Sequence, residues 1–403
     1  MEVLEQLYKM TAFSSLFSEP GIIIMLIIGC VLLYLGIAKK FEPLLLVPIG
    51  FGVVLANLPG GGMGVVDPKL IELENGHYMN LFEIAHEYGI MNFLYYSLIK
   101  TGFLPPIIFM GVGALTDFGP MLRNLKLAFF GAAAQIGIFA VLLAAIFLGF
   151  TPQEAGSLGI IGGADGPTAI YTTIKLAPHL LGPIAIAAYS YMALVPVIIP
   201  LVSKLLMTKK EFLINMKEQD KLYPSKYEIK NLKLVKIIFP IALGIVTAII
   251  VPSSVPLLGM LLFGNLVKEL GTLTSRLADA ASGPIMNTAT IFLGLSVGAT
   301  MTHDVFLKGQ TLGIVVGGFL AFAISIAGGI LATKVYNMFS KKKINPLVGA
   351  CGLSAVPMAS RVANEVALKH DKNNHILMYC MAPNISGVIG SAVAAGVLIS
   401  MLQ

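Results

Sequence analysis

The sequence predicts an all-α polytopic membrane protein, and three observations lead to this fold class. Of the 403 residues, 56% are hydrophobic and 12% are charged, and the mean hydropathy is +0.85, which is too apolar for a soluble chain of this length. The 42 glycines and 22 prolines fit bent helices that pack closely. Several windows lack Asp, Glu, Lys and Arg and exceed the roughly 20 residues that a helix needs to span a bilayer. These windows are 127–153, 176–203, 309–333 and 373–403.

Basic clusters set the predicted topology, because short cytoplasmic loops of membrane proteins collect Lys and Arg. Lys39 and Lys40 place the end of the first helix in the cytoplasm, and Arg123 and Lys126 do the same for a later turn. The segment 59–100 is polar and mildly acidic, so we expect an external loop there. The predicted crossings of the first half are 21–38, 43–58, 103–120, 127–150 and 180–203.

A lysine-rich linker decides how the segment 154–175 is interpreted. Residues 204–236 hold nine lysines against four acids, so the linker 207–233 is expected in the cytoplasm. A full crossing by 154–175 would deliver this linker to the outside. We therefore predict that 154–175 is a re-entrant hairpin that enters the membrane from outside.

The second half follows the same plan with opposite orientation. A second hairpin, 345–368, is expected to enter from the cytoplasm, which gives about ten transmembrane helices and two hairpins in all. The predicted crossings of this half are 234–252, 255–270, 284–300, 310–333 and 373–402.

Short sequence matches between the halves predict an inverted repeat. GGADGPTA at 162–169 aligns with GLSAVPMA at 352–359, and IFMG at 108–111 recurs as IFLG at 291–294. We expect one repeat in 1–206 and the other in 234–403. Inverted repeats place the substrate site at mid-membrane, where the two interrupted segments meet.

Asp165 is the central candidate for a functional site. It is the one acidic residue between Glu154 and Lys175, and it lies in Gly-Gly-Ala-Asp-Gly-Pro-Thr, which cannot continue a regular helix. An ionisable group in lipid needs a partner or a function. One interpretation is a carboxylate that caps a short helix outside the membrane. The other is a cation site in which Asp165, the carbonyl of Gly163 and the hydroxyl of Thr168 supply oxygen ligands to Na⁺.

Other polar residues leave two interpretations open. Arg361 is either an ordinary cytoplasmic positive residue or a fork that grips a carboxylate. Asn384 either forms hydrogen bonds between helices or serves as a ligand in the site. Tyr189 and Tyr191 are either interfacial anchors or polar groups that face the site. Asn345 and Ser354 stand with Arg361 among the apolar residues of the second hairpin.

Before any resemblance is considered, a secondary transporter fits the composition, the repeat and Asp165 as well as a pump does. Such a protein would exchange Na⁺ for an organic anion or a proton without chemistry. A structural scaffold leaves Asp165 and Arg361 unexplained. Nothing in the net charge of +6 indicates nucleic acid as a partner.

Nearly the whole chain resembles the beta subunit of the biotin-dependent, sodium-translocating decarboxylases, which act on oxaloacetate, methylmalonyl-CoA, glutaconyl-CoA or malonate. The motifs that carry the resemblance are AKKFEPLLLVPIGFG (38–52), IFMGVGALTDFGP (108–120), GIIGGADGPTAIY (159–171), AAYSYMALVP (187–196), TIFLGLSVGA (290–299), KINPLVGACGLSAVPMASRV (343–362) and MAPNISGVIGSAVAAGV (381–397). The external segment 59–100 looks shorter than in oxaloacetate-type members, which favours an acyl-CoA or other member.

The resemblance implies roles for the candidate residues. It implies that Asp165, Arg361 and Tyr191 act in catalysis. The residues implied to bind carboxybiotin are Arg361, Asn345, Gly349 and Tyr189. The residues expected to hold Na⁺ are Asp165, Asn384, Ser354, Gly163 and Thr168.

The resemblance also implies the reaction and the partners. The biotin would be carried covalently on a separate biotin carrier protein, and a carboxyltransferase alpha subunit would load it to give carboxybiotin. This subunit would decarboxylate carboxybiotin, consume a proton and use the free energy to move Na⁺ outward. A small membrane gamma or delta subunit and a homo-oligomeric core are further expectations. The expected location is the cytoplasmic membrane of a bacterium or archaeon.

Overall fold

The computed structural model describes residues 19–40, 42–72, 78–224 and 229–403, and within these ranges it is helical, with one isolated β-bridge and no named strand. Parts of the predicted first repeat, external segment and linker fall on 1–18, 41, 73–77 and 225–228, which lie outside the described residues. The fold class predicted from the sequence is confirmed.

The α-helices of the first half and the linker alternate long apolar segments with short connecting pieces. They are α3 (Pro20–Ile37), α4 (Pro43–Ala56), α5 (Leu81–Leu94), α6 (Leu104–Leu115), α7 (Gly119–Arg123), α8 (Leu125–Ala134), α9 (Ile136–Phe147), α10 (Pro152–Gly159), α11 (Gly166–Leu176), α12 (Leu181–Leu206), α13 (Lys209–Phe212) and α14 (Met216–Leu222).

The second half begins after the linker and ends with α23, a helix of 26 residues. Its α-helices are α15 (Leu232–Ile250), α16 (Val255–Glu269), α17 (Ser275–Ala280), α18 (Met286–Ala299), α19 (His303–Phe306), α20 (Gly309–Phe339), α21 (Pro346–Ala350), α22 (Met358–His370) and α23 (Leu377–Leu402). Short 3₁₀ or π turns lie between several of them, at η1 (Pro68–Ile71), η2 (Tyr95–Ile99), η3 (Ile160–Gly163), η4 (Pro178–Leu180), η5 (Pro252–Ser254), η6 (Gly271–Leu273) and η7 (Ala281–Ile285).

Six described segments are long and apolar enough to cross a membrane, and two bent pairs raise this to eight. The six are Pro20–Ile37, Leu125–Phe147, Leu232–Ile250, Ser275–Ala299, Gly313–Phe339 and Leu377–Leu402. The helix α4 is apolar but only 14 residues long. The protein is therefore a multi-pass membrane protein, whereas the count of ten crossings and the inverted repeat remain predictions.

The segment 59–100 differs from the loop that its polar composition predicts. Asn80 forms a capping box with Glu83 and starts the helix α5, which is kinked at Gly89 (φ 76°) and leads through η2 to Ile99. This stretch meets α6 at a bend of 68°. Gly102 supplies the left-handed backbone (φ 75°) at the bend, which is a conformation that favours glycine.

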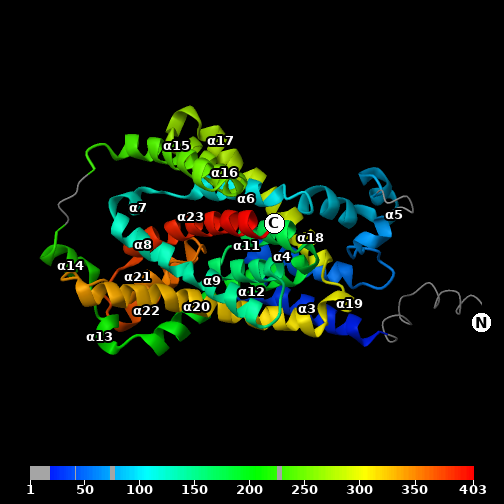
Figure 1. Cartoon of the computed structure of the whole chain (residues 1–403), viewed down its shortest axis with the longest axis horizontal. Coiled ribbons are helices and arrows are strands. Elements are labelled where there is room, and N and C mark those ends of the chain that lie inside the picture. Colours follow the sequence, from blue (N-terminus) through cyan, green and yellow to red (C-terminus); the bar gives the residue numbers. More distant parts are fainter. Residues whose placement is uncertain (1–18, 41, 73–77, 225–228) are drawn as a thin grey trace, which may run out of the picture.

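Polar groups that were predicted on the same side of the membrane meet in the structure. On the cytoplasmic side, Lys236 pairs with Glu269 at 3.3 Å across 33 positions of sequence. On the external side, His303 pairs with Glu19 at 3.0 Å, and the hydroxyls of Ser253 and Ser400 lie 2.8 Å apart. In Figure 1 the linker helices α13 and α14 lie at one end, and α5 and α19 at the other. These contacts agree with the predicted grouping of segment ends, and which end faces the cytoplasm remains a prediction.

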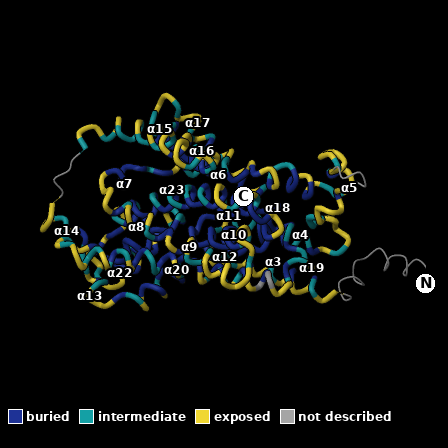
Figure 2. Tube along the Cα trace, in the orientation of Figure 1, coloured by how far each residue is buried: buried dark blue, intermediate teal, exposed yellow. Residues whose placement is uncertain are grey.

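Burial distinguishes a packed interior from an apolar exterior (Figure 2). The helix α15 has a mean hydropathy of 2.2, within the range of the other candidate spans, yet only 6% of its window is buried, so its surface suits contact with lipid acyl chains. By contrast, α23 buries 56% of its window, and α8, α11 and α22 pack against it. The candidate site lies on this buried helix.

Candidate functional site

The first interrupted segment surrounds Asp165. The helix α10 and the 3₁₀ turn η3 end at Gly163, and Ala164 then takes a left-handed backbone (φ 55°), which stops the helix. Asp165 caps α11, because its Oδ1 accepts a hydrogen bond of 3.3 Å from the amide of Thr168. The side chain is only 7% exposed. Asp165 is thus a buried helix cap, and its role as a cation ligand remains a prediction.

The second interrupted segment has the same design. The helix α21 ends at Ala350, α22 begins at Met358, and the residues between them are non-helical. The two interruptions touch through their backbones, since the amide of Ser354 donates to the carbonyl of Gly163 at 3.1 Å. Helices of 8, 11, 5 and 13 residues are too short to span a bilayer singly, which fits two hairpins that meet.

The helix α23 joins the two interruptions through hydroxyl groups. The Ser391 hydroxyl lies 3.0 Å from Oδ2 of Asp165, and the Ser354 hydroxyl lies 2.8 Å from Ser391. Asn384 holds the second hairpin on both sides of its interruption, because its Nδ2 donates to Leu353 O and its Oδ1 accepts from the Ser360 hydroxyl at 3.0 Å. A single polar network thus runs from the first hairpin to the second.

Several buried polar atoms in this region have no hydrogen-bond partner among the described residues. They are Oε1 of Gln135, Oγ1 of Thr168, the Tyr189 hydroxyl and Oγ of Ser325. An unpaired polar atom in the interior costs free energy on the order of 1–3 kcal/mol unless something satisfies it. One carboxylate surrounded by neutral oxygen atoms is a donor set that suits a hard monovalent cation.

Gln135 and Ser391 are two members of the site that the sequence analysis missed. The amide of Gln135 donates to carbonyls of three glycines at 3.1 to 3.4 Å, Gly131, Gly352 and Gly387. The available signal was an amide and a hydroxyl inside charge-free windows of otherwise apolar residues.

The two tyrosines of α12 point to different neighbours. Tyr189 packs against the start of α11, where a Cβ added to Gly166 would fall 2.0 Å from its ring. Tyr191 packs against α20, with its ring centroid 5.8 Å from that of Phe319 and 6.0 Å from that of Phe322. The structure therefore brings Tyr189, and not Tyr191, against the Asp165 segment.

Asn345 and Gly349, both expected at carboxybiotin, have packing roles here. Asn345 is fully buried, caps α21 through the Leu347 amide, and donates to the linker carbonyls of Phe212 and Ile214. All polar atoms of its side chain are thus engaged. A Cβ on Gly349 would lie 2.1 Å from the carbonyl oxygen of Gly329, so this glycine lets α21 approach α20 closely.

Arg361 lies one turn into α22 and is exposed, and no described group forms a hydrogen bond or ion pair with its side chain. Its charge is felt at Glu42, in the turn between α3 and α4: burial raises the pKa of the Glu42 carboxyl, and Arg361 opposes that rise. Arg361 therefore lies within electrostatic range of the predicted cytoplasmic turn, and its side chain is unengaged by the described residues.

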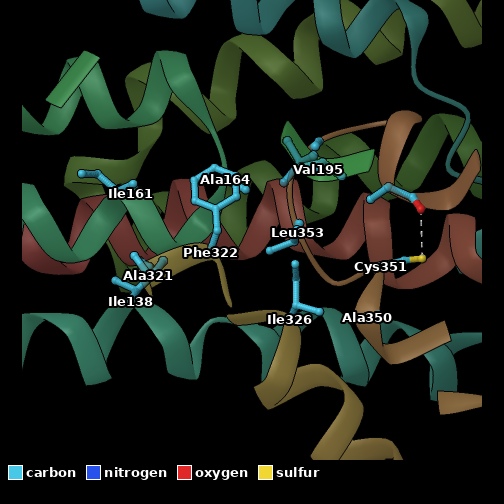
Figure 3. Packing of buried hydrophobic residues seen from close by; sticks show 14 of the residues in the cluster. Ile138, Ile161, Ala164, Val195, Ala321, Phe322, Ile326, Ala350, Cys351 and Leu353 are labelled. Carbon is cyan, nitrogen blue, oxygen red and sulfur yellow. Dashed lines mark hydrogen bonds between the residues drawn. The ribbon is translucent and has the colours of Figure 1, made fainter. Parts of the chain in front are cut away.

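Apolar packing fixes both interruptions in one cluster (Figure 3). Ala164 of the first and Leu353 of the second are both buried in it, together with Ile138, Val195 and Phe322. The interruptions are thus held by neighbouring helices and not by lipid, as backbone groups at membrane depth require.

The comparisons with known proteins bear on what this arrangement does. The family model described as "Na+-transporting oxaloacetate decarboxylase beta subunit" matches residues 21–402. The chain belongs to this family. It is 49% identical over 410 residues to the methylmalonyl-CoA decarboxylase subunit beta of Propionigenium modestum, covering 100% of this chain and 99% of the relative. It is 46% identical over 419 residues to the oxaloacetate decarboxylase beta chain of Klebsiella pneumoniae, covering 94% of each.

A third relative, the methylmalonyl-CoA decarboxylase subunit beta of Veillonella parvula, is 47% identical over 387 residues, with 95% of this chain and 94% of the relative covered. Membership confirms the prediction from the motifs: the chain is a membrane subunit of a multi-subunit, sodium-transporting decarboxylase. Relatives with the two substrate names are nearly equally similar, so these identities do not distinguish an acyl-CoA member from an oxaloacetate member.

Proposed function

We propose that this subunit decarboxylates carboxybiotin and uses the free energy to move Na⁺ outward through the Asp165 site. The observation that carries the proposal is the meeting of two interrupted helices at a buried carboxylate, with the Ser354 amide 3.1 Å from the Gly163 carbonyl. The polar network and the unpaired oxygen atoms lie around this junction. Transporters with interrupted helices bind their ions at such junctions.

Sodium would bind by replacing hydrogen bonds at Asp165. The Ser391 hydroxyl has one proton and two acceptors in reach, Asp165 at 3.0 Å and Val388 O at 3.0 Å. A cation at Asp165 would favour the second acceptor, leaving the serine oxygen lone pairs for the ion. Because Ser391 is also bonded to Ser354, that change reaches the second hairpin directly. Thr168, Gly163 and Asn384 remain in the proposed set of sodium ligands.

Carboxybiotin would be held at Arg361. The guanidinium is exposed and unengaged within the described part of the chain, and its planar fork matches a carboxylate. In the reaction the bond between the carboxylate carbon and the biotin nitrogen breaks, CO₂ leaves, and the electron pair on nitrogen takes up a proton. Tyr191 remains a proposed catalytic residue on the resemblance alone. Tyr189 is proposed to act as a polar group beside Asp165.

The proposal extends to partners and place. A biotin carrier would bring the carboxylated cofactor to the cytoplasmic face, after loading by a carboxyltransferase alpha subunit, and a small gamma or delta subunit would share the membrane. The cytoplasmic membrane of a bacterium or archaeon is the proposed location. Motion of one hairpin-bearing bundle of an inverted repeat, 1–206 or 234–403, would expose the ion to each side in turn.

The test is decarboxylation of carboxybiotin by the reconstituted membrane complex, with and without Na⁺, comparing the wild type with Asp165→Asn. We expect Na⁺-stimulated CO₂ release that the substitution abolishes, and Arg361→Ala is expected to raise the KM for carboxybiotin. Asp304→Asn, at an acid on the predicted external side, is the matched control. Na⁺-dependent uptake of another anion without carboxybiotin turnover would instead support a secondary transporter.

A further inference from the structure

A cavity of about 760 Å³ lies apart from the Asp165 site, between α7, α8, α14, α20 and the start of α23. Its size is in the range of small-molecule sites. None of the residues assigned above to Na⁺ or carboxybiotin lines it. The cavity therefore needs its own explanation.

The charge of the lining is strongly one-sided. Four cations, Arg123, Lys126, Lys341 and Lys342, face one acid, Asp220, which leaves three net positive charges. Asp220 is already engaged, because it accepts from Lys342 at 2.5 Å and from the Tyr379 hydroxyl at 2.5 Å. The remaining three cations have no ion-pair partner within the described ranges of the chain.

Backbone groups add to this positive field. The helix α8 starts at Leu125 on the cavity wall, and no side chain caps it. The amides of Leu125 and Lys126 therefore have no acceptor among the described residues, whereas that of Leu127 donates to Asn124 O. The N-terminus of a helix attracts anions through these amides and the helix dipole. Here the N-terminus of α8 lies at the cavity together with the three unpaired cations, and this combination indicates an anionic ligand.

The surface beside the cavity is apolar and open. Leu125 and Phe129 of α8 are 59% and 66% exposed, and Met338 and Phe339 at the end of α20 are 77% and 86% exposed. A multi-pass membrane protein presents such side chains to acyl chains. A ligand with an anionic headgroup and apolar chains would fit both the basic cavity and the apolar surface beside it.

We propose that the cavity binds the phosphate group of an anionic phospholipid of the cytoplasmic leaflet, with the acyl chains along α8 and the end of α20. Basic pockets between helices on the cytoplasmic side are the kind of site that recognises acidic headgroups. The bound lipid would tie the linker helix α14 to α7, α20 and α23. This assignment stands independently of the sodium and carboxybiotin sites.

The absence of tryptophan from the sequence allows a direct test. Phe339→Trp places one indole beside the cavity, and Phe147→Trp, at a residue that is 90% exposed on α9, is the control position. Each full-length variant is placed in nanodiscs of phosphatidylcholine that contain brominated phosphatidylglycerol or brominated phosphatidylcholine, and quenching of the indole fluorescence is measured. A triple variant, Arg123→Gln, Lys126→Gln and Lys341→Gln, is made in the Phe339→Trp background.

We expect brominated phosphatidylglycerol to quench Trp fluorescence in Phe339→Trp at about tenfold lower mole fraction than brominated phosphatidylcholine, as expected when several cations hold one headgroup. The triple variant should lose this preference. A control triple in the linker, Lys209→Gln, Lys210→Gln and Lys217→Gln, should keep it, although it removes the same charge. Phe147→Trp should show no preference.

Equal quenching by the two lipids, or a preference that survives the cavity triple, would overturn the proposal. Loss of the preference in excess inorganic phosphate would show instead a site for small anions. If the triple variant does not fold, crosslinking of photoactivatable phosphatidylglycerol to the unaltered chain tests the proposal. Labels concentrated in 122–127 and 336–344 support the site, and labels spread evenly over the lipid-facing helices contradict it.

Discussion

Asn345→Ala separates a packing role from a ligand role, and the structure sets the size of its effect. The substitution removes a helix cap, worth about 1 kcal/mol, and two hydrogen bonds to the linker carbonyls of Phe212 and Ile214, each worth about 1 kcal/mol. The cap stabilises α21 and not the linker, so the linker should open more easily by about 2 kcal/mol, or roughly 30-fold in the opening equilibrium.

Hydrogen exchange of the amides of 212–222 measures this opening, with the KM for carboxybiotin determined on the same folded preparation. Asn80→Ala is the matched control, because Asn80 caps α5 far from the linker. Its substitution should leave linker exchange unchanged. Unaltered linker protection in Asn345→Ala together with a raised KM would refute the packing role and restore Asn345 as a direct ligand of carboxybiotin.

Two further predictions concern side chains whose surroundings differ. Tyr189→Phe should raise the Na⁺ concentration for half-maximal decarboxylation several-fold, and Tyr191→Phe should change it less, since only Tyr189 contacts the Asp165 segment; equal effects would contradict this difference. Glu42→Gln should lower the KM for carboxybiotin, because it removes a negative charge that Arg361 feels. Burial raises the pKa of Glu42, so its charge develops as pH rises and should weaken anion binding there. A KM–pH profile that is identical in Glu42→Gln and wild type would rule this out.

The sequence was sufficient to predict the helical membrane fold and the two interruptions, because these depend on composition and on glycine and proline. Hydropathy identifies apolar helices, and Gly162–Pro167 cannot continue one. The predicted hairpins 154–175 and 345–368 coincide with α10–α11 and α21–α22 within a few residues. Whether each enters from the predicted side remains a prediction.

The partners of single polar residues were harder to predict, because the same amide can cap, pack or bind. Asn345 was predicted at carboxybiotin, and the sequence did not reveal that its side chain donates to the linker carbonyls of Phe212 and Ile214. Gln135 and Ser391 were missed, since a single amide or hydroxyl in an apolar helix ordinarily forms a hydrogen bond to a neighbouring helix. The helix α5 was missed because Glu83 and Glu87 made its segment polar, although the Asn80–Glu83 spacing of a capping box was readable.

The contact between the two interruptions has a consequence for mutational surveys of this family. The Ser354 amide and the Gly163 carbonyl are main-chain atoms, so ordinary side-chain substitutions at either position leave donor and acceptor in place. Alanine at 354 removes the hydroxyl that bonds Ser391 but keeps the amide, so an alanine scan reports on the side chain and does not test the main-chain contact. Only proline at 354, or an ester in place of that amide, deletes the donor, so the junction must be probed by backbone chemistry.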